Sequence, residues 1–176
     1  MENKISSQQI YSGAIINVTL DDIELENGKM AKREVVHHNG GVGILTLINH
    51  QILLVKQFRY AQNEYTIEIP EGKIELGENP YNTAMREIEE ETGYSVKELK
   101  LFSEVLPTPG YCTEKLYLYE AFGVEKVPNP LKGDEDEFID LIFMDLDEAY
   151  QMVLDLKIRD AKTIIAIMYA YQNYRR

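Results

Sequence analysis

The chain has 176 residues, about the length of one domain, and 44% of them are hydrophobic, so it can bury an ordinary core and is not a disordered chain. Its 18 basic and 30 acidic residues give a net charge of −12, which argues against nucleic acid or an anionic membrane as the partner. If the substrate carries phosphate groups, a bound divalent cation is the first candidate to offset this negative field locally.

The features of the sequence that bear on cellular location favour the cytoplasm. Cys112 is the one cysteine, so no intrachain disulfide can form. Residues 1–13 carry charges without a following apolar stretch, which is not typical of a secretory signal. No apolar run approaches the ~20 residues that span a bilayer. We therefore expect a soluble, cytoplasmic protein.

A small β-rich piece is predicted at residues 1–40. Residues 15–20 are apolar and β-branched, Asn27 and Gly28 are the signal of a tight hairpin, and residues 30–36 suit the returning strand. A piece of this size has little core of its own, so we expect it to pack on the main domain or on another subunit.

The remaining residues, 41–176, mix predicted strands with a few helices and indicate an α/β or α+β domain. The strands are expected at 42–48, 52–57, 65–69, 100–105, 115–122 and 139–145, and the helices at 81–92, 147–154 and 161–171. Asn79 and Pro80 precede the first of these helices and Gly93 follows it, as is typical of helix ends.

Three glutamates share one face of the first predicted helix. Glu87, Glu90 and Glu91 are spaced i, i+3 and i+4, so they project from the side opposite Met85 and Ile88. Carboxylates packed in this way repel one another unless solvent or a cation screens them, and Mg²⁺ suits carboxylates together with substrate phosphate. The simpler alternative is a solvated acidic face, and the spacing of the residues around the helix argues against it.

That spacing joins the helix to the loop before it. Gly72 is followed after five residues by Glu78, after seven more by Arg86-Glu87-Ile88, and then by Glu90-Glu91 and Gly93-Tyr94. The pattern resembles the Nudix box of the Nudix hydrolases, with a small departure at its last residue, which is more usually aliphatic. The resemblance implies a Nudix fold, with a mixed β-sheet between helices. It also implies Mg²⁺- or Mn²⁺-dependent hydrolysis of a nucleoside diphosphate linked to another moiety.

The resemblance assigns roles to the residues of the box. Glu87 and Glu91 are expected to bind the metal, with Glu90 in the metal shell and Glu91 also counted as catalytic. The carbonyl of Glu71 is a further expected ligand, although related pyrophosphatases often carry alanine there. Bound cations neutralise the diphosphate and lower the pKa of a water molecule that attacks it. The residues expected to be structural are Gly72, Glu78, Arg86 and Gly93, with Glu78 and Arg86 forming an ion pair.

Two loops resemble marks of the ADP-ribose pyrophosphatase subgroup. Pro109 lies sixteen residues after the last glycine of the box, and we expect Pro109 and Gly110 to lie beside the substrate. An ordinary turn is the alternative. The acidic run at 134–137 resembles the loop that carries the general base in that subgroup. Glu135 is the first choice for the general base, and Glu137 is expected to be a metal ligand or the base. The sequence does not decide which of the two is the base. A solvated charged loop is the alternative there.

The resemblance to this subgroup extends over roughly the whole chain and implies a homodimer in which residues 1–40 pack, domain-swapped, on the partner subunit. Arg59 is expected to contact substrate phosphate, for which its planar fork is suited, although a surface cation is the alternative. Arg33 and Glu34 are expected to line the adenosine pocket across the dimer, and a strand-surface ion pair is the alternative.

These residues predict a Mg²⁺-dependent enzyme that hydrolyses ADP-ribose to AMP and ribose 5-phosphate. Pyrophosphatases of GDP- or UDP-sugars are the nearest alternative, and hydrolases of oxidised nucleoside triphosphates are a more distant one. A non-catalytic domain that senses ADP-ribose is an alternative from another class. Such domains commonly lose glutamates of the box, and this chain keeps them all.

Overall fold

The computed structural model describes residues 1–133 and 138–175. The chain forms two compact units, Met1–Gly40 with Leu106–Lys115, and Gly41–Val105 with Leu116–Arg176. Residues 106–115 therefore fall between two stretches of the second unit in sequence, yet they belong to the first.

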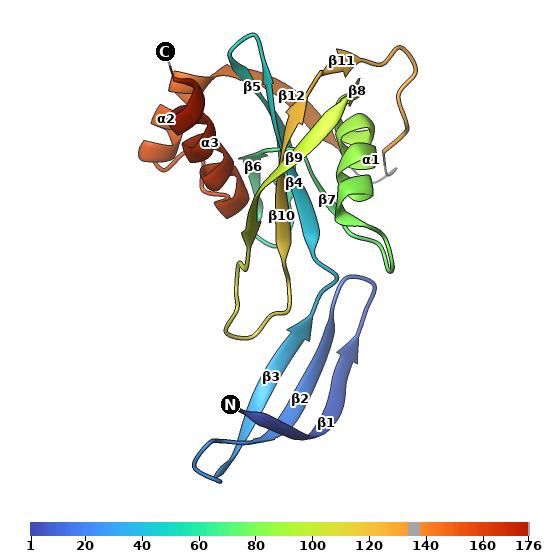
Figure 1. The fold of residues 1–176 in the computed structure, drawn as a ribbon, viewed down its shortest axis with the longest axis vertical. Coiled ribbons are helices and arrows are strands. Elements are labelled where there is room, and N and C mark those ends of the chain that lie inside the picture. Colours follow the sequence, from blue (N-terminus) through green and yellow to red (C-terminus); the bar gives the residue numbers. More distant parts are fainter. Residues whose placement is uncertain (134–137, 176) are drawn as a thin grey trace. The chain divides into compact units, whose positions relative to one another are not determined.

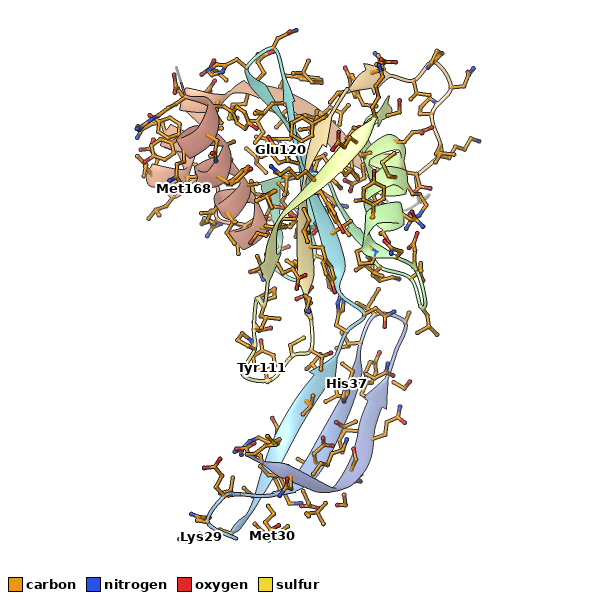
Figure 2. All side chains as sticks on the ribbon, viewed as in Figure 1. Lys29, Met30, His37, Tyr111, Glu120 and Met168 are labelled. Atoms are coloured by element: carbon orange, nitrogen blue, oxygen red, sulfur yellow. The ribbon has the colours of Figure 1, made fainter. Side chains whose placement is uncertain are left out.

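The first unit is built on a three-stranded antiparallel sheet in the order β1-β2-β3 (Figure 1). Its strands are β1 (Asn3–Ser12), β2 (Asn17–Glu24) and β3 (Met30–His37). The predicted hairpin lies between β2 and β3, where Gly28 has a φ of 75° that suits glycine in a turn. β1 was not predicted, and every one of its residues is exposed. Side chains project from both faces of this sheet (Figure 2).

The segment 106–115 is tied to the end of β3 by backbone hydrogen bonds. The N–H of Val36 donates to the carbonyl of Tyr111 at 2.8 Å, and the N–H of Thr113 donates to the carbonyl of Val36 at 2.9 Å. The hydroxyl of Thr113 also accepts a bond from the N–H of His38 at 3.0 Å. These bonds hold the proline-containing loop on the first unit.

The second unit contains a mixed sheet in the order β12-β5-β4-β10-β9, with β6 paired to β5 and β7 paired to β4. β4 and β10 run parallel, and the other pairs are antiparallel. Its strands are β4 (Gly41–Ile48), β5 (Gln51–Arg59), β6 (Glu64–Glu68), β7 (Glu71–Lys73), β9 (Glu98–Val105), β10 (Leu116–Phe122) and β12 (Ile139–Asp145). A separate short ribbon joins β8 (Tyr94–Ser95) to β11 (Glu125–Lys126).

Helices cover both faces of this sheet, so the predicted mixed sheet between helices is confirmed. Helix α1 (Pro80–Thr92) lies on one side, and α2 (Leu146–Leu154) with α3 (Ala161–Tyr174) lies on the other (Figure 1). The core is divided in the same way. Its α1 side includes Val42, Ile44, Leu53, Ala84 and Ile88, and its α2–α3 side includes Leu45, Leu54, Leu118, Ala149 and Ile167.

Candidate active site

Helix α1 has well-formed ends and a buried apolar stripe. The side chain of Asn79 accepts a hydrogen bond from the N–H of Tyr81 at 2.9 Å, and Pro80 starts the helix. Gly93 ends it in the left-handed conformation, with φ 71°. The stripe includes Ala84 and Ile88, which are both fully buried. This stripe fixes the rotation of the helix and leaves its acidic face turned away from the core.

The acidic face of α1 lies against the short strand β7. A side chain at Gly72 would collide with the side chain of Glu87 in its present position, so glycine leaves room for this close approach. The N–H of Glu71 donates a hydrogen bond to Glu91 Oε2 at 2.9 Å. The backbone of β7 is thereby joined to the side chains of α1.

One arginine binds several of the helix glutamates. Arg86 Nη1 donates to Glu87 Oε1 at 2.8 Å and to Glu90 Oε2 at 2.6 Å. Its Nε and Nη2 reach the two oxygens of Glu78 at 3.4 and 3.3 Å. Burial alone would lower the pKa of Arg86, but these hydrogen bonds raise it above its ordinary value. We call Glu78, Arg86, Glu87, Glu90 and Glu91 the α1 acid cluster.

The donor set of the α1 acid cluster fits a hard divalent cation, because such ions prefer carboxylate oxygens. Glu87 and Glu91 both contact β7, and Glu90 lies one turn from Glu87 on the same face. Over residues 1–133 and 138–175, no group of three or more His, Cys, Asp or Glu side chains is arranged to hold a metal ion. Binding would therefore require Glu87 and Glu90 to exchange Arg86 for the metal.

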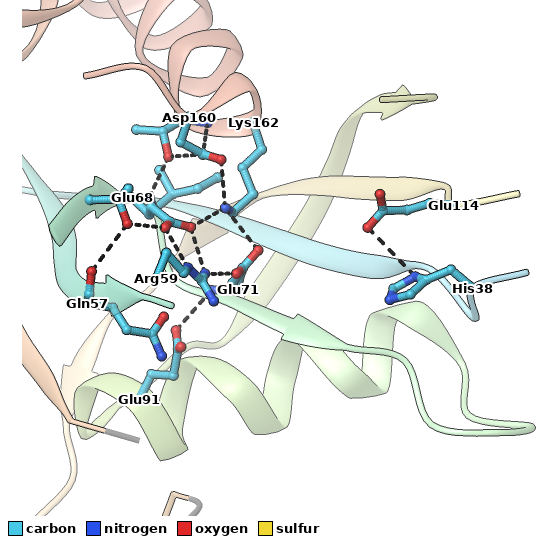
Figure 3. Close-up of polar contacts among 12 residues, drawn as sticks. His38, Gln57, Arg59, Glu68, Glu71, Glu91, Glu114, Asp160 and Lys162 are labelled. Carbon is cyan, nitrogen blue, oxygen red and sulfur yellow. Dashed lines mark hydrogen bonds and ion pairs between the residues drawn. The ribbon is translucent and has the colours of Figure 1, made fainter. Parts of the chain in front are cut away.

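A second ionic cluster lies beside Glu71, and most of it was not predicted (Figure 3). Arg59, at the end of β5, makes a bidentate pair with Glu68, with Nε–Oε1 and Nη2–Oε2 distances of 2.7 Å. Nη2 of Arg59 also donates to Glu71 Oε1. Glu68 is nearly buried, with 3% of its side chain exposed.

Lys162 joins this second cluster from α3. Its side chain is 5% exposed, and its ammonium contacts Glu68, Glu71 at 2.9 Å and Asp160 at 3.0 Å. Asp160 is held in place as the N-cap of α3, where it accepts the N–H of Thr163 at 2.9 Å. We call Arg59, Glu68, Glu71, Asp160 and Lys162 the buried ion cluster.

Opposite charges in the buried ion cluster stabilise one another. Burial alone would lower the pKa of Lys162, but the carboxylates around it raise this pKa above its ordinary value. Burial alone would raise the pKa of Glu68, but Arg59 and Lys162 lower it. One signal of this cluster was present in the sequence, since a lysine in the first turn of a helix is disfavoured by the helix dipole. Its presence there indicates a specific anionic partner.

The other predicted site residues belong to the first unit or fall outside the described residues. Arg33 and Glu34 are neighbours on β3, and Arg33 pairs with Glu2, with an Nη2–Oε1 distance of 2.5 Å. Pro109 and Gly110 lie in the segment 106–115 of the same unit. The predicted general bases are Glu135 and Glu137, and both fall outside the residues that the structure describes.

In the described part of the chain, no helix is both long enough and apolar enough to pass through a membrane.

The whole chain is similar to known proteins in both sequence and fold. A family model described as NUDIX domain matches residues 37–167, and one described as nucleoside diphosphate sugar hydrolase N-terminal domain matches residues 2–36. A solved structure of an ADP compounds hydrolase superposes with a TM-score of 0.87 at 20% identity, covering 99% of this chain and 97% of that one.

Curated relatives match over nearly the whole chain. The methanol dehydrogenase activator of Bacillus methanolicus is 43% identical over 169 residues, which cover 96% of this chain and 91% of the relative. The ADP-ribose pyrophosphatase of Bacillus subtilis (strain 168) is 40% identical with the same coverage. The GDP-mannose pyrophosphatase of Citrobacter koseri is 31% identical over 185 residues, which cover 98% and 94% of the two chains.

Proposed function

The chain belongs to the Nudix family, and from this membership we propose that it hydrolyses the pyrophosphate bond of ADP-ribose to AMP and ribose 5-phosphate. The observation that carries the choice of substrate is the 40% identity, over 96% of the chain, to an ADP-ribose pyrophosphatase. The relative that acts on GDP-mannose is less similar, at 31%. The intact α1 acid cluster supports an enzyme rather than a non-catalytic sensor.

The metal-binding part of the proposed site lies on α1 and β7. Glu87 and Glu91 would hold Mg²⁺ or Mn²⁺, with Glu90 beside them and the carbonyl of Glu71 as a further ligand. The ion would neutralise the diphosphate and lower the pKa of the attacking water. Gly72 supports this assignment because it lets the backbone of β7 lie directly against Glu87.

The phosphate-binding part is proposed to be Arg59. A third of its side chain is exposed, and the bidentate pair with buried Glu68 fixes the orientation of its guanidinium. A carboxylate in the loop at 134–137, Glu135 or Glu137, would accept a proton from the attacking water.

The first unit is proposed to supply the rest of the site and the dimer contact. Arg33 and Glu34 would line the adenosine pocket of a homodimer, and Pro109 with Gly110 would border the substrate. Support for the dimer comes from exposed apolar side chains on the first unit. They are Ile5, Ile10, Tyr11, Ile15 and Met30, each more than half exposed. We propose a cytoplasmic location, which suits the single unpaired cysteine.

A second candidate function is activation of a dehydrogenase, and the 43% identical relative from Bacillus methanolicus favours it. Such a role would be compatible with hydrolysis by the same site. It is tested by assaying a methanol dehydrogenase with and without the purified chain. Activation by the wild type but not by Glu91→Gln would make the effect depend on the Nudix site, and no activation would exclude the role for that dehydrogenase.

The proposed hydrolysis is tested with a substrate panel in the presence of Mg²⁺. ADP-ribose, GDP-mannose, a UDP-sugar and an oxidised dGTP are incubated with the chain, and the products are separated by chromatography. The proposal predicts that ADP-ribose has the highest kcat/KM. Faster turnover of another nucleotide sugar would keep the reaction and change the substrate. No turnover by a folded protein would favour the sensor.

A further inference from the structure

We propose that the side chain of Glu71 competes with substrate phosphate for Arg59 and so sets how tightly the chain binds a diphosphate. The inference rests on the proposed function, because it takes Arg59 as the group that binds phosphate. Glu71 would then have two separate roles. Its carboxylate would compete for Arg59, and its backbone carbonyl would bind the metal.

Two carboxylates share one nitrogen of Arg59. Nη2 donates to Glu68 Oε2 at 2.7 Å and also to Glu71 Oε1 (Figure 3). A phosphate oxygen that binds Nη2 must displace one of them, since the nitrogen carries only two hydrogens. The structure therefore places an internal anion on the nitrogen that this proposal assigns to substrate phosphate.

Burial decides which carboxylate can leave. Glu68 is 3% exposed and is held by Arg59, by Lys162 and by the hydroxyl of Thr66. Glu71 is 27% exposed, so its carboxylate can regain water when it is released. Glu68 is the fixed partner of Arg59, and Glu71 is the exchangeable one.

The charges of the buried ion cluster also allow Glu71 to leave. Two cations, Arg59 and Lys162, face three carboxylates, Glu68, Glu71 and Asp160. After Glu71 departs, Arg59 keeps Glu68 and Lys162 keeps both Glu68 and Asp160. No buried cation is left without a carboxylate, which is the costly outcome when an ion pair is broken.

Release of Glu71 requires only the side chain to move. Its backbone is paired with Gly43 in the sheet, and its N–H donates to Glu91 Oε2 at 2.9 Å. These contacts do not involve its carboxylate. The strand that carries the proposed metal-binding carbonyl can therefore stay in place while the carboxylate exchanges with phosphate.

The experiment measures binding of inorganic pyrophosphate by isothermal titration calorimetry, in EDTA so that no divalent metal takes part. The proteins are the wild type, Glu71→Gln and Glu71→Ala. We expect both variants to bind pyrophosphate about threefold to tenfold more tightly than the wild type, because Arg59 no longer has a competing internal anion.

A matched control separates this effect from a general loss of negative charge. Glu64→Gln removes the same charge from an exposed pair with Arg159, in which both N–O distances are 2.6 Å. We expect the affinity of Glu64→Gln for pyrophosphate to stay within twofold of that of the wild type. In the double variant that combines Arg59→Lys with Glu71→Gln, the gain in pyrophosphate affinity should disappear, because lysine cannot offer the planar fork of arginine.

Three results would overturn the inference. They are an affinity of the Glu71 variants equal to or below that of the wild type, an equal gain in Glu64→Gln, and no binding of millimolar pyrophosphate by any of the proteins. Pyrophosphate has no base or sugar, so the result does not depend on whether ADP-ribose is the substrate. A wild type that leaves ADP-ribose intact would defeat the proposed function and leave this inference to be judged by the pyrophosphate titration.

Discussion

The α1 acid cluster and the buried ion cluster both pair basic side chains with carboxylates, but they differ in burial and in their spread along the sequence. The α1 acid cluster lies between residues 78 and 91, and Arg86 at its centre is a third exposed. The buried ion cluster joins residues from 59 to 162, and Lys162 at its centre is 5% exposed. The first can release its carboxylates to a metal at modest cost, whereas the second keeps Glu68 and Lys162 fixed and stabilises the fold around Arg59.

The largest expected effect is on stability and comes from Lys162→Met. Removing the ammonium leaves buried Glu68 with Arg59 as its one cationic partner among the described residues and should reduce the free energy of unfolding by about 3–5 kcal/mol. Urea denaturation measures the change from the midpoint and slope. The control is Lys97→Met, which breaks an exposed pair with Glu125 and should leave the midpoint unchanged. Equal effects of the two substitutions would remove the distinction between the clusters.

The next effect is on turnover and comes from Glu91→Gln. Loss of a metal-binding carboxylate should reduce kcat for ADP-ribose at least about a hundredfold, while the thermal midpoint changes little because the α1 acid cluster contributes little to stability. Glu89→Gln, on the same helix but outside the acidic face, is the matched control and should retain turnover. Full turnover in Glu91→Gln would show that this carboxylate does not bind the catalytic metal.

Acid should destabilise the buried ion cluster by an amount similar to the effect of Lys162→Met. The pKa of Glu68 is about 2 in the folded chain against an ordinary 4.5, so its contribution is complete above pH 4.5 and is lost as the pH falls towards 2. The loss should be on the order of 3 kcal/mol. Urea midpoints measured from pH 5 to pH 3 should fall steeply in the wild type and less steeply in Glu68→Gln. Equal slopes in the two proteins would contradict this assignment.

The smallest effect is expected from Arg86→Gln. Its ion pairs are partly exposed, so the free energy of unfolding should fall by no more than about 1 kcal/mol, as measured in urea. Turnover of ADP-ribose should also change little, because Glu87 and Glu90 must release Arg86 when they bind the metal. A loss of stability as large as that caused by Lys162→Met would show that the two clusters contribute equally to the free energy of unfolding.

The sequence predicted the α1 acid cluster because its residues lie within one loop and one helix. A spacing of three or four residues places side chains on the same face whatever the rest of the fold does. The buried ion cluster depends on β5, β6, β7 and α3 meeting in space, which no local pattern reveals. Arg59 was named as a phosphate ligand by resemblance, but its partners Glu68 and Lys162 were not.

The fold shows the same division. The six longer strands of the second unit were predicted, because buried strands such as β4 and β5 are nearly continuous apolar runs. β1 was missed because it is polar and exposed, and backbone pairing with β2 defines it, with contacts such as Ser6 Oγ to Asp22 Oδ2 at 2.8 Å. Local patterns therefore predict strands that are buried in the core and miss those held by pairing alone.

The proposed hydrolysis is tested most directly by the Mg²⁺-dependent release of AMP from ADP-ribose, followed by chromatography with and without EDTA. We expect AMP and ribose 5-phosphate in equal amounts, with the reaction stopped by EDTA and restored by added Mg²⁺. ADP-ribose that remains intact in the presence of folded protein and Mg²⁺ would contradict it.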